Sequence, residues 1–447
     1  MDFTSHSDRD REYILNSVGV SSFEELLNRV LPEKFQLKRE LDLPSGISEY
    51  QLSREFGELA DHNRPASDGL CLLGGGAYDH YIPAALSHIL SRSEFYTAYT
   101  PYQAEVSQGT LQTIYEFQTV ICRLMGMDAA NASHYDGATA LAEAVMLAVR
   151  KNKRQAVVVP AGLNPPYREV LETYCLPAGI EIRTLSSDSG RIIPKELKKL
   201  ANGAGAVVIQ HPNFFGLLEP VRESAQAAHD AGALVISSTY PVSLALLEPP
   251  GEWGADIATA EGQPFGAALN LGGPYVGLFA VKKPLIRMMP GRLVGRTRDT
   301  QDRDGYVLTL QTREQHIRRE KATSNICTNE ALVALGALVY LSLIGANGLK
   351  QVAENSYRSA HYLADKLNNI PNVSLHFDDD FFNEFVVNLP RPAEGVCEKL
   401  AERNIFIGPS LGRWFPEMEN NLLVAVTEKL SRADLDRFVD KLHEVVG

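Results

Sequence analysis

Short apolar runs alternate with helical segments through the middle of the chain. The runs are rich in β-branched and aliphatic residues, and they lie at 156–160, 180–185, 206–210, 233–238, 255–260 and 275–281. Helical spacing of apolar residues fills the stretches between them, at 164–179, 194–203 and 219–232. Such runs are typical of parallel strands that are covered on both faces. We therefore predict a doubly wound α/β domain with a mostly parallel sheet.

Helical spacing also dominates the regions on either side of this domain. Predicted helices cover 21–35, 48–63, 110–126, 137–153, 329–348 and 348–370. The end of the chain reads as strand, strand, helix, strand and helix, at 373–377, 384–390, 394–404, 421–427 and 432–446. Residues 72–77 read as a glycine-rich turn, and residues 292–321 as irregular. These patterns predict a helical and loop segment at 1–105, the large α/β domain at 106–328 and a small α+β domain at 329–447.

The composition is that of an ordinary soluble protein. Among the 447 residues, 45% are hydrophobic and 22% charged, and the net charge of -12 argues against nucleic acid as a main partner. The five scattered cysteines have no CxxC spacing, so we expect neither a disulfide framework nor a metal site, and a reduced, cytoplasmic location. The acidic N-terminus lacks a signal-peptide core, and no apolar run approaches the ~20 residues of a membrane span.

Three local strings carry a resemblance to a known family. Residues 74–121, which include YTAYTPYQAE, are similar to the N-terminal half of glycine decarboxylase, the P-protein of the glycine cleavage system. Residues 130–144 and 305–329 resemble the same family, and the similarity covers essentially the whole chain. The resemblance implies a pyridoxal-phosphate fold-type I architecture. A split form of the family has two chains, and this chain resembles the first, the alpha-type subunit or subunit 1.

The resemblance also implies a reaction and a set of partners. The family decarboxylates glycine and transfers the aminomethyl group to the lipoyl arm of the H-protein. In the split form, a catalytic beta-type subunit (subunit 2) would supply pyridoxal phosphate, in an α2β2 heterotetramer. A rival hypothesis is a purely structural or regulatory scaffold, a pseudoenzyme whose degenerate pocket contributes no chemistry.

A fold-type I cofactor site needs a lysine for the aldehyde, an aspartate for the pyridine nitrogen and a helix N-terminus for the phosphate. The best alignment places Gln263 at the lysine, although an ordinary loop residue remains the alternative. No lysine occurs between Lys199 and Lys282. The aspartate would end the run at 233–238, where Ser237, Ser238 and Thr239 stand instead. The segment that begins with Asp136 could still bind an anion, but the Asp136 carboxylate would repel phosphate. We therefore expect no covalently bound cofactor on this chain.

Two further strings are candidates for completing the partner's site. Tyr99 and Tyr102, which flank Pro101, would present rigid phenols at the substrate entrance with Gln103 beside them, or the rings would simply pack at an interface. Thr323, Ser324 and Asn325 would reach the partner's phosphate, or would cap a helix that begins near Asn329.

Other polar residues have weaker interpretations. The arginines of the irregular stretch would attract an acidic carrier domain or form a solvated basic face; they are Arg292, Arg296, Arg298, Arg303 and Arg313. We expect His134 and Tyr135 to be structural remnants and Cys327 to be a buried thiol.

Overall fold

The computed structural model describes residues 6–39, 41–326 and 329–447, which fall into two units, Met1–Arg64 and Pro65–Gly447. The first unit contains α1 (Asp8–Ser17), α2 (Phe23–Val30) and α3 (Glu49–Ala60), with the 3-10 turn η1 (Glu33–Phe35). Serine hydroxyls cap all three α-helices at Ser7, Ser22 and Ser48. None of these helices has a buried residue, so their apolar faces are exposed in this chain.

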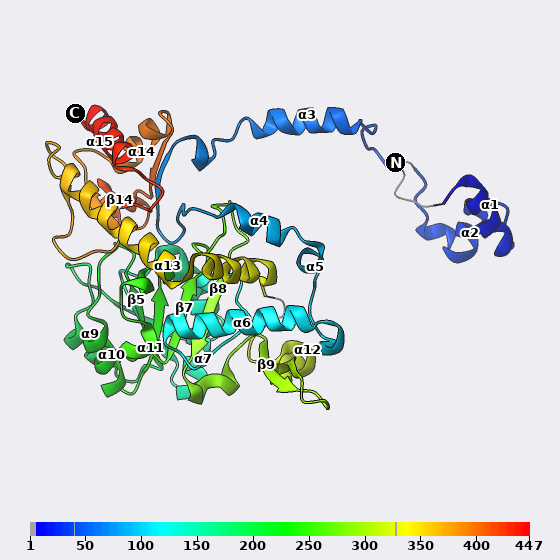
Figure 1. The fold of residues 1–447 in the computed structure, drawn as a ribbon, viewed down its shortest axis with the longest axis horizontal. Coiled ribbons are helices and arrows are strands. Elements are labelled where there is room, and N and C mark those ends of the chain that lie inside the picture. The colour runs from blue at the N-terminus through cyan, green and yellow to red at the C-terminus, as the bar shows by residue number, and fades with distance from the viewer. Residues whose placement is uncertain (1–5, 40, 327–328) are drawn as a thin grey trace. The chain divides into compact units, whose positions relative to one another are not determined.

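A seven-stranded sheet forms the centre of the second unit (Figure 1). Its order is β2-β8-β7-β6-β5-β3-β4, and every strand except β8 runs in the same direction. The strands are β2 (Ala129–Ala130), β3 (Ala156–Pro160), β4 (Glu181–Leu185), β5 (Ala206–His211), β6 (Leu234–Thr239), β7 (Ile257–Glu261) and β8 (Gly277–Val281). All six apolar runs of the sequence are strands, and a mostly parallel sheet is confirmed.

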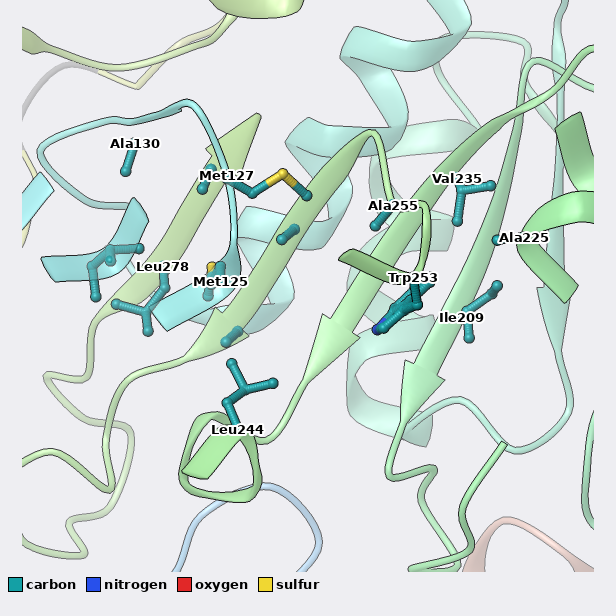
Figure 2. Packing of buried hydrophobic residues seen from close by; sticks show 14 of the residues in the cluster. Met125, Met127, Ala130, Ile209, Ala225, Val235, Leu244, Trp253, Ala255 and Leu278 are labelled. Carbon is teal, nitrogen blue, oxygen red and sulfur yellow. The ribbon is translucent and has the colours of Figure 1, made fainter. Parts of the chain in front are cut away.

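Helices cover both faces of this sheet, as the continuous apolar strands require. Val158, Val207 and Val235 pack in one cluster with α6, α10 and α13, and Figure 2 shows the part of that cluster around Trp253. Val157 and Val159 point to the other face and pack with α7 and α8. The helices of this region are α4 (Ala84–Leu90), α5 (Ser93–Tyr96), α6 (Gln108–Met125), α7 (Gly137–Asn152), α8 (Pro165–Cys175), α9 (Pro194–Leu200), α10 (Val221–Asp230) and α11 (Pro250–Trp253).

A smaller core lies at the C-terminal end of the chain. It combines the antiparallel strands β11 (Ser374–Leu375), β12 (Glu384–Asn388) and β14 (Asn421–Ala425) with α14 (Ala393–Ala401) and α15 (Arg432–Val446). A second, parallel pair joins β1 (Leu70–Leu73) to β13 (Ile405–Gly408). Both strands of this pair were missed by the sequence analysis, and β1 overlaps the predicted glycine-rich turn. The division at 105 and 328 stays a prediction.

The stretch predicted as irregular contains a β-hairpin, which corrects that prediction. Its strands are β9 (Leu293–Arg298) and β10 (Asp304–Thr309), and the short helix α12 (Gln315–Arg318) follows. The two helices predicted at 329–370 follow one another within α13 (Ala331–Leu367) and are separated by a non-helical break at Gly345. Contrary to the sequence prediction on apolar runs, α13 is long and apolar enough to cross a membrane. It instead contributes Ala334, Ala337 and Tyr340 to the core beside the sheet.

Candidate functional site

The carboxyl ends of β3, β5, β6 and β7 meet the segment after β1 and the start of β12 around a small polar cavity. In an open parallel sheet this edge is where ligands bind. The cavity has a volume of only about 30 Å³. Small-molecule sites usually occupy about 300 Å³ or more. The side chains that fill the space include Tyr78, Tyr167, Ser238, Tyr240, Glu261 and Glu384.

Gln263 follows β7 and is completely buried. Its Oε1 accepts from the Tyr78 amide at 2.9 Å, and its Nε2 donates to the carbonyls of Tyr78 at 2.9 Å and Ala267 at 2.7 Å. The side-chain amide thus ties the segment after β1 to the connection between β7 and β8. Both halves of the amide are used, so Gln263 has a clear packing role. Its assignment to the lysine position stays a prediction.

The end of β6 carries hydroxyls where the resemblance places an aspartate. The Ser237 and Thr239 hydroxyls lie 2.6 Å apart, and the Thr259 hydroxyl donates to the Ser237 carbonyl at 2.9 Å. All three side chains are buried, and Ser238 lines the cavity. This end of the strand therefore carries a neutral hydrogen-bonded group and no carboxylate.

The N-terminus of α7 holds two acidic side chains of the chain itself. Asp136 is the N-cap and accepts from the Thr139 amide at 2.7 Å. Glu261, at the end of β7, accepts from the Gly137 amide at 2.9 Å. Burial raises the pKa of Glu261 to about 8, against the lowering effect of its backbone hydrogen bonds. Asp136 was predicted from the sequence but Glu261 was not, since its only sequence signal is an acid at the end of an apolar strand.

Two buried hydrogen-bonded groups close the cavity on the side of the small core. Tyr78 donates to Glu384 Oε2 at 2.7 Å, and the Gly75 amide donates to Glu384 Oε1 at 2.7 Å. His80 bonds Glu428 through Nδ1 at 2.6 Å and the Tyr240 hydroxyl through Nε2. These contacts bind the segment after β1 to both cores. Together they act as a lock between the cores.

Substitution of Glu384 by glutamine is expected to flatten the pH dependence of stability. Burial raises the pKa of Glu384 from 4.5 to about 7, so the folded chain holds this proton more tightly than the unfolded chain. The resulting stabilisation is present below about pH 4.5 and is lost as the pH rises to about 7, a change of about 3 kcal/mol. Thermal unfolding from about pH 5 to about pH 8 measures it. Over this pH range, the Tm of wild type and of the exposed-site control Glu402→Gln should fall more steeply than the Tm of Glu384→Gln. Three parallel curves of Tm against pH would contradict this account.

Tyr99, Tyr102 and Gln103 lie together on one exposed loop between α5 and α6. Tyr99 is 79% exposed and Tyr102 54%. Two side chains pack against the Tyr102 ring. The guanidinium of the buried Arg292 lies 5.5 Å from the ring centroid, and the His316 ring lies edge-on at a centroid distance of 5.8 Å. This loop presents its aromatic side chains to the outside, as both interpretations of the sequence require.

Residues 323–325 lie at the outer end of the connection to α13. The Ser324 hydroxyl donates to Glu143 on α7 at 2.8 Å, and Arg150 donates to the Thr323 carbonyl, whereas Asn325 is exposed. The N-cap of α13 is Glu330, without a side-chain cap bond. The alternative hypothesis of a helix cap at 323–325 is therefore wrong. Cys327 lies outside the described residues.

The arginines of the hairpin region are mostly neutralised within the chain. Three of them pair with aspartates of the same hairpin, Arg296 with Asp304 at 2.6 Å, Arg298 with Asp302 at 2.6 Å and Arg303 with Asp299 at 2.7 Å. Arg292 is buried, and Arg313 donates to the Gly291 carbonyl at 2.9 Å. Among these five arginines, the charges of Arg296, Arg298 and Arg303 are therefore balanced within the hairpin.

His134 is a packing residue in this structure. It is fully buried and stacks on Phe279 with a centroid distance of 4.8 Å. Burial lowers the pKa of its imidazole to about 3, so the ring is neutral. Within the part of the chain that the structure describes, no group of three or more His, Cys, Asp or Glu side chains is placed to hold a metal ion.

Comparison with known proteins decides the family. The model of the glycine cleavage system P-protein family matches residues 1–442. The chain belongs to the glycine cleavage system P-protein family. The probable glycine dehydrogenase (decarboxylating) subunit 1 of Prosthecochloris aestuarii is 52% identical over 447 residues, 100% of both chains. A crystal structure of the glycine decarboxylase (P-protein) of the glycine cleavage system, in inhibitor-bound form, superimposes with a TM-score of 0.93 at 44% identity and covers 100% of both chains.

More distant structures agree on the architecture. Glutamate decarboxylase of Lactobacillus brevis has a TM-score of 0.67 at 14% identity, over 93% of this chain and 96% of that one. Together with the P-protein structure, this likeness confirms the predicted fold-type I class. The site residues assigned from the sequence stay predictions.

Proposed function

We propose that this chain is the subunit of a two-chain glycine dehydrogenase (decarboxylating) that carries no cofactor. A catalytic beta-type subunit 2 supplies the lysine and the pyridoxal phosphate, in an α2β2 heterotetramer in the cytoplasm. The complex decarboxylates glycine and transfers the aminomethyl group to the lipoyl arm of the H-protein. The observation that carries the proposal is the full-length similarity to a protein named subunit 1 of this enzyme.

The residues of the cleft do not fit pyridoxal phosphate, which supports its assignment to the partner. No lysine occurs between Lys199 and Lys282, and the end of β6 offers hydroxyls to a pyridine nitrogen. The amides at the start of α7 are bonded to carboxylates of the chain, and the free space is about 30 Å³. The cofactor of the fold needs a lysine and a carboxylate partner, so we derive no chemical step in this cleft.

We assign two segments of this chain, 99–103 and 323–325, to the partner's active site. Tyr99, Tyr102 and Gln103 form part of the substrate entrance, and their exposure on one loop supports this role. Thr323 and Asn325 face outward and remain free to meet the partner's phosphate. Ser324 orients this string through its bond to Glu143. Docking of the H-protein is not assigned to the hairpin arginines, since three of them are already paired.

Visible absorbance with added pyridoxal phosphate tests the proposal. The purified chain alone should show no bound-cofactor band, whereas the chain coexpressed with its subunit 2 should show one and should exchange labelled carbon dioxide into glycine. A band from this chain alone that borohydride reduction abolishes, leaving a covalent pyridoxyl label mapped to one of its lysines, would overturn the proposal. An active subunit 2 that needs no subunit 1 would favour the scaffold hypothesis.

A further inference from the structure

The start of α7 in this chain resembles an anion site that is already filled. The first four amides of a helix lack intrahelical partners and readily bind phosphate. Here the Gly137 amide bonds Glu261 at 2.9 Å, and the Thr139 amide bonds Asp136 at 2.7 Å. The Asp136 amide donates to the Thr139 hydroxyl at 3.2 Å. Three of the four amides therefore have partners within the chain.

Glu261 is held in this position from several directions. Its Oε2 accepts from the Gly137 amide, while its Oε1 accepts from the amides of Gln263 at 2.9 Å and Val276 at 3.3 Å. The residue is 7% exposed. Three backbone amides from three segments thus converge on one carboxylate, which is the kind of donor set that protein backbones offer to anions.

From this geometry we infer that Glu261 is the residue that excludes phosphate, and hence pyridoxal phosphate, from the cleft of this chain. The inference deepens the proposed function, on which it rests for the cofactor's identity. A phosphate placed against the same amides would meet the Glu261 and Asp136 side chains at contact distance and would find these amides already bonded. The chain therefore places its own carboxyl group where the cofactor's phosphate would bind. The absent lysine and the occupied phosphate position would each prevent pyridoxal phosphate from binding, independently of one another.

Binding of inorganic phosphate to the full chain tests this inference without the partner and without turnover. Isothermal titration compares wild type with the double variant Asp136→Asn, Glu261→Ala, in which asparagine keeps the helix cap. The double variant should bind phosphate at least about ten-fold more tightly than wild type, because the amides of Gly137, Gln263 and Val276 lose their carboxyl partner. The control Asp136→Asn, Glu261→Gln keeps an amide side chain of the same size in place and should bind no better than wild type.

Two results would overturn the inference. One is a folded double variant, by circular dichroism, that binds phosphate no better than wild type. The other, which needs no variant, is specific thermal stabilisation of the wild-type chain by phosphate, beyond that given by chloride at equal ionic strength. Neither result depends on whether the complex with subunit 2 exchanges carbon dioxide, so the proposed function is tested independently of this inference.

Discussion

Replacement of Gly216 by alanine is expected to lower the free energy of unfolding by about 3–5 kcal/mol. Gly216 has a φ of +85°, and a Cβ at this position would lie 1.9 Å from the Glu384 carbonyl oxygen and 2.4 Å from its carbon. Both contacts are with backbone, so no side-chain rotation relieves them. The loop after β5 and strand β12 would have to separate, which would also disturb the Glu384 lock between the two cores.

A matched control separates this steric effect from the backbone preference of glycine. Gly203 also has a positive φ, +75°, but an added Cβ would meet nothing within 4 Å. Gly203→Ala should therefore cost only the left-handed strain, about 1–2 kcal/mol. Thermal unfolding of both variants, followed by circular dichroism, measures the difference. Equal losses in the two variants would show that the contact with Glu384 contributes little.

The central sheet could be predicted because its strands are apolar on both faces. Val157 and Val158 point to opposite faces, and both are completely buried. Such a continuous apolar run can be distinguished from the apolar spacing of a helix without knowing which strands lie beside it. Pairing between strands that are far apart in the sequence produces no such local pattern. β1 pairs with β13 across more than three hundred residues, and its position beside a glycine run made it read as a turn.

The absence of lysine between Lys199 and Lys282 can be read directly from the sequence, whereas the contacts of the candidate site cannot. The occupation of the α7 N-terminus by Glu261 depends on the register of β7 beside that helix, which a single sequence does not fix. The ion pairs of Arg296, Arg298 and Arg303 were not predictable for a similar reason, because Asp299, Asp302 and Asp304 meet them only once the hairpin has formed.

Tyr102→Ala is expected to lower kcat/KM of the reconstituted complex roughly ten- to hundred-fold, the cost of losing a positioned group beside a substrate. Tyr99→Ala should have a smaller effect. The two rings differ in how firmly they are held, since Tyr102 packs between Arg292 and His316 whereas Tyr99 is 79% exposed. A fixed ring guides a substrate without first losing conformational freedom, whereas a free ring must be ordered on each binding event. Glycine-dependent exchange of labelled carbon dioxide measures the effect.

The same experiment separates a role in the site from a role in assembly. Size-exclusion chromatography must show the complex of each variant to be intact, and Tyr13→Ala, at an equally exposed tyrosine of the first unit, serves as the control. Tyr102→Phe should retain most of the activity if the ring face is what matters, and little if the hydroxyl contacts glycine. An intact Tyr102→Ala complex with wild-type turnover would assign the tyrosine loop to subunit contact alone, and would favour the scaffold hypothesis for this chain.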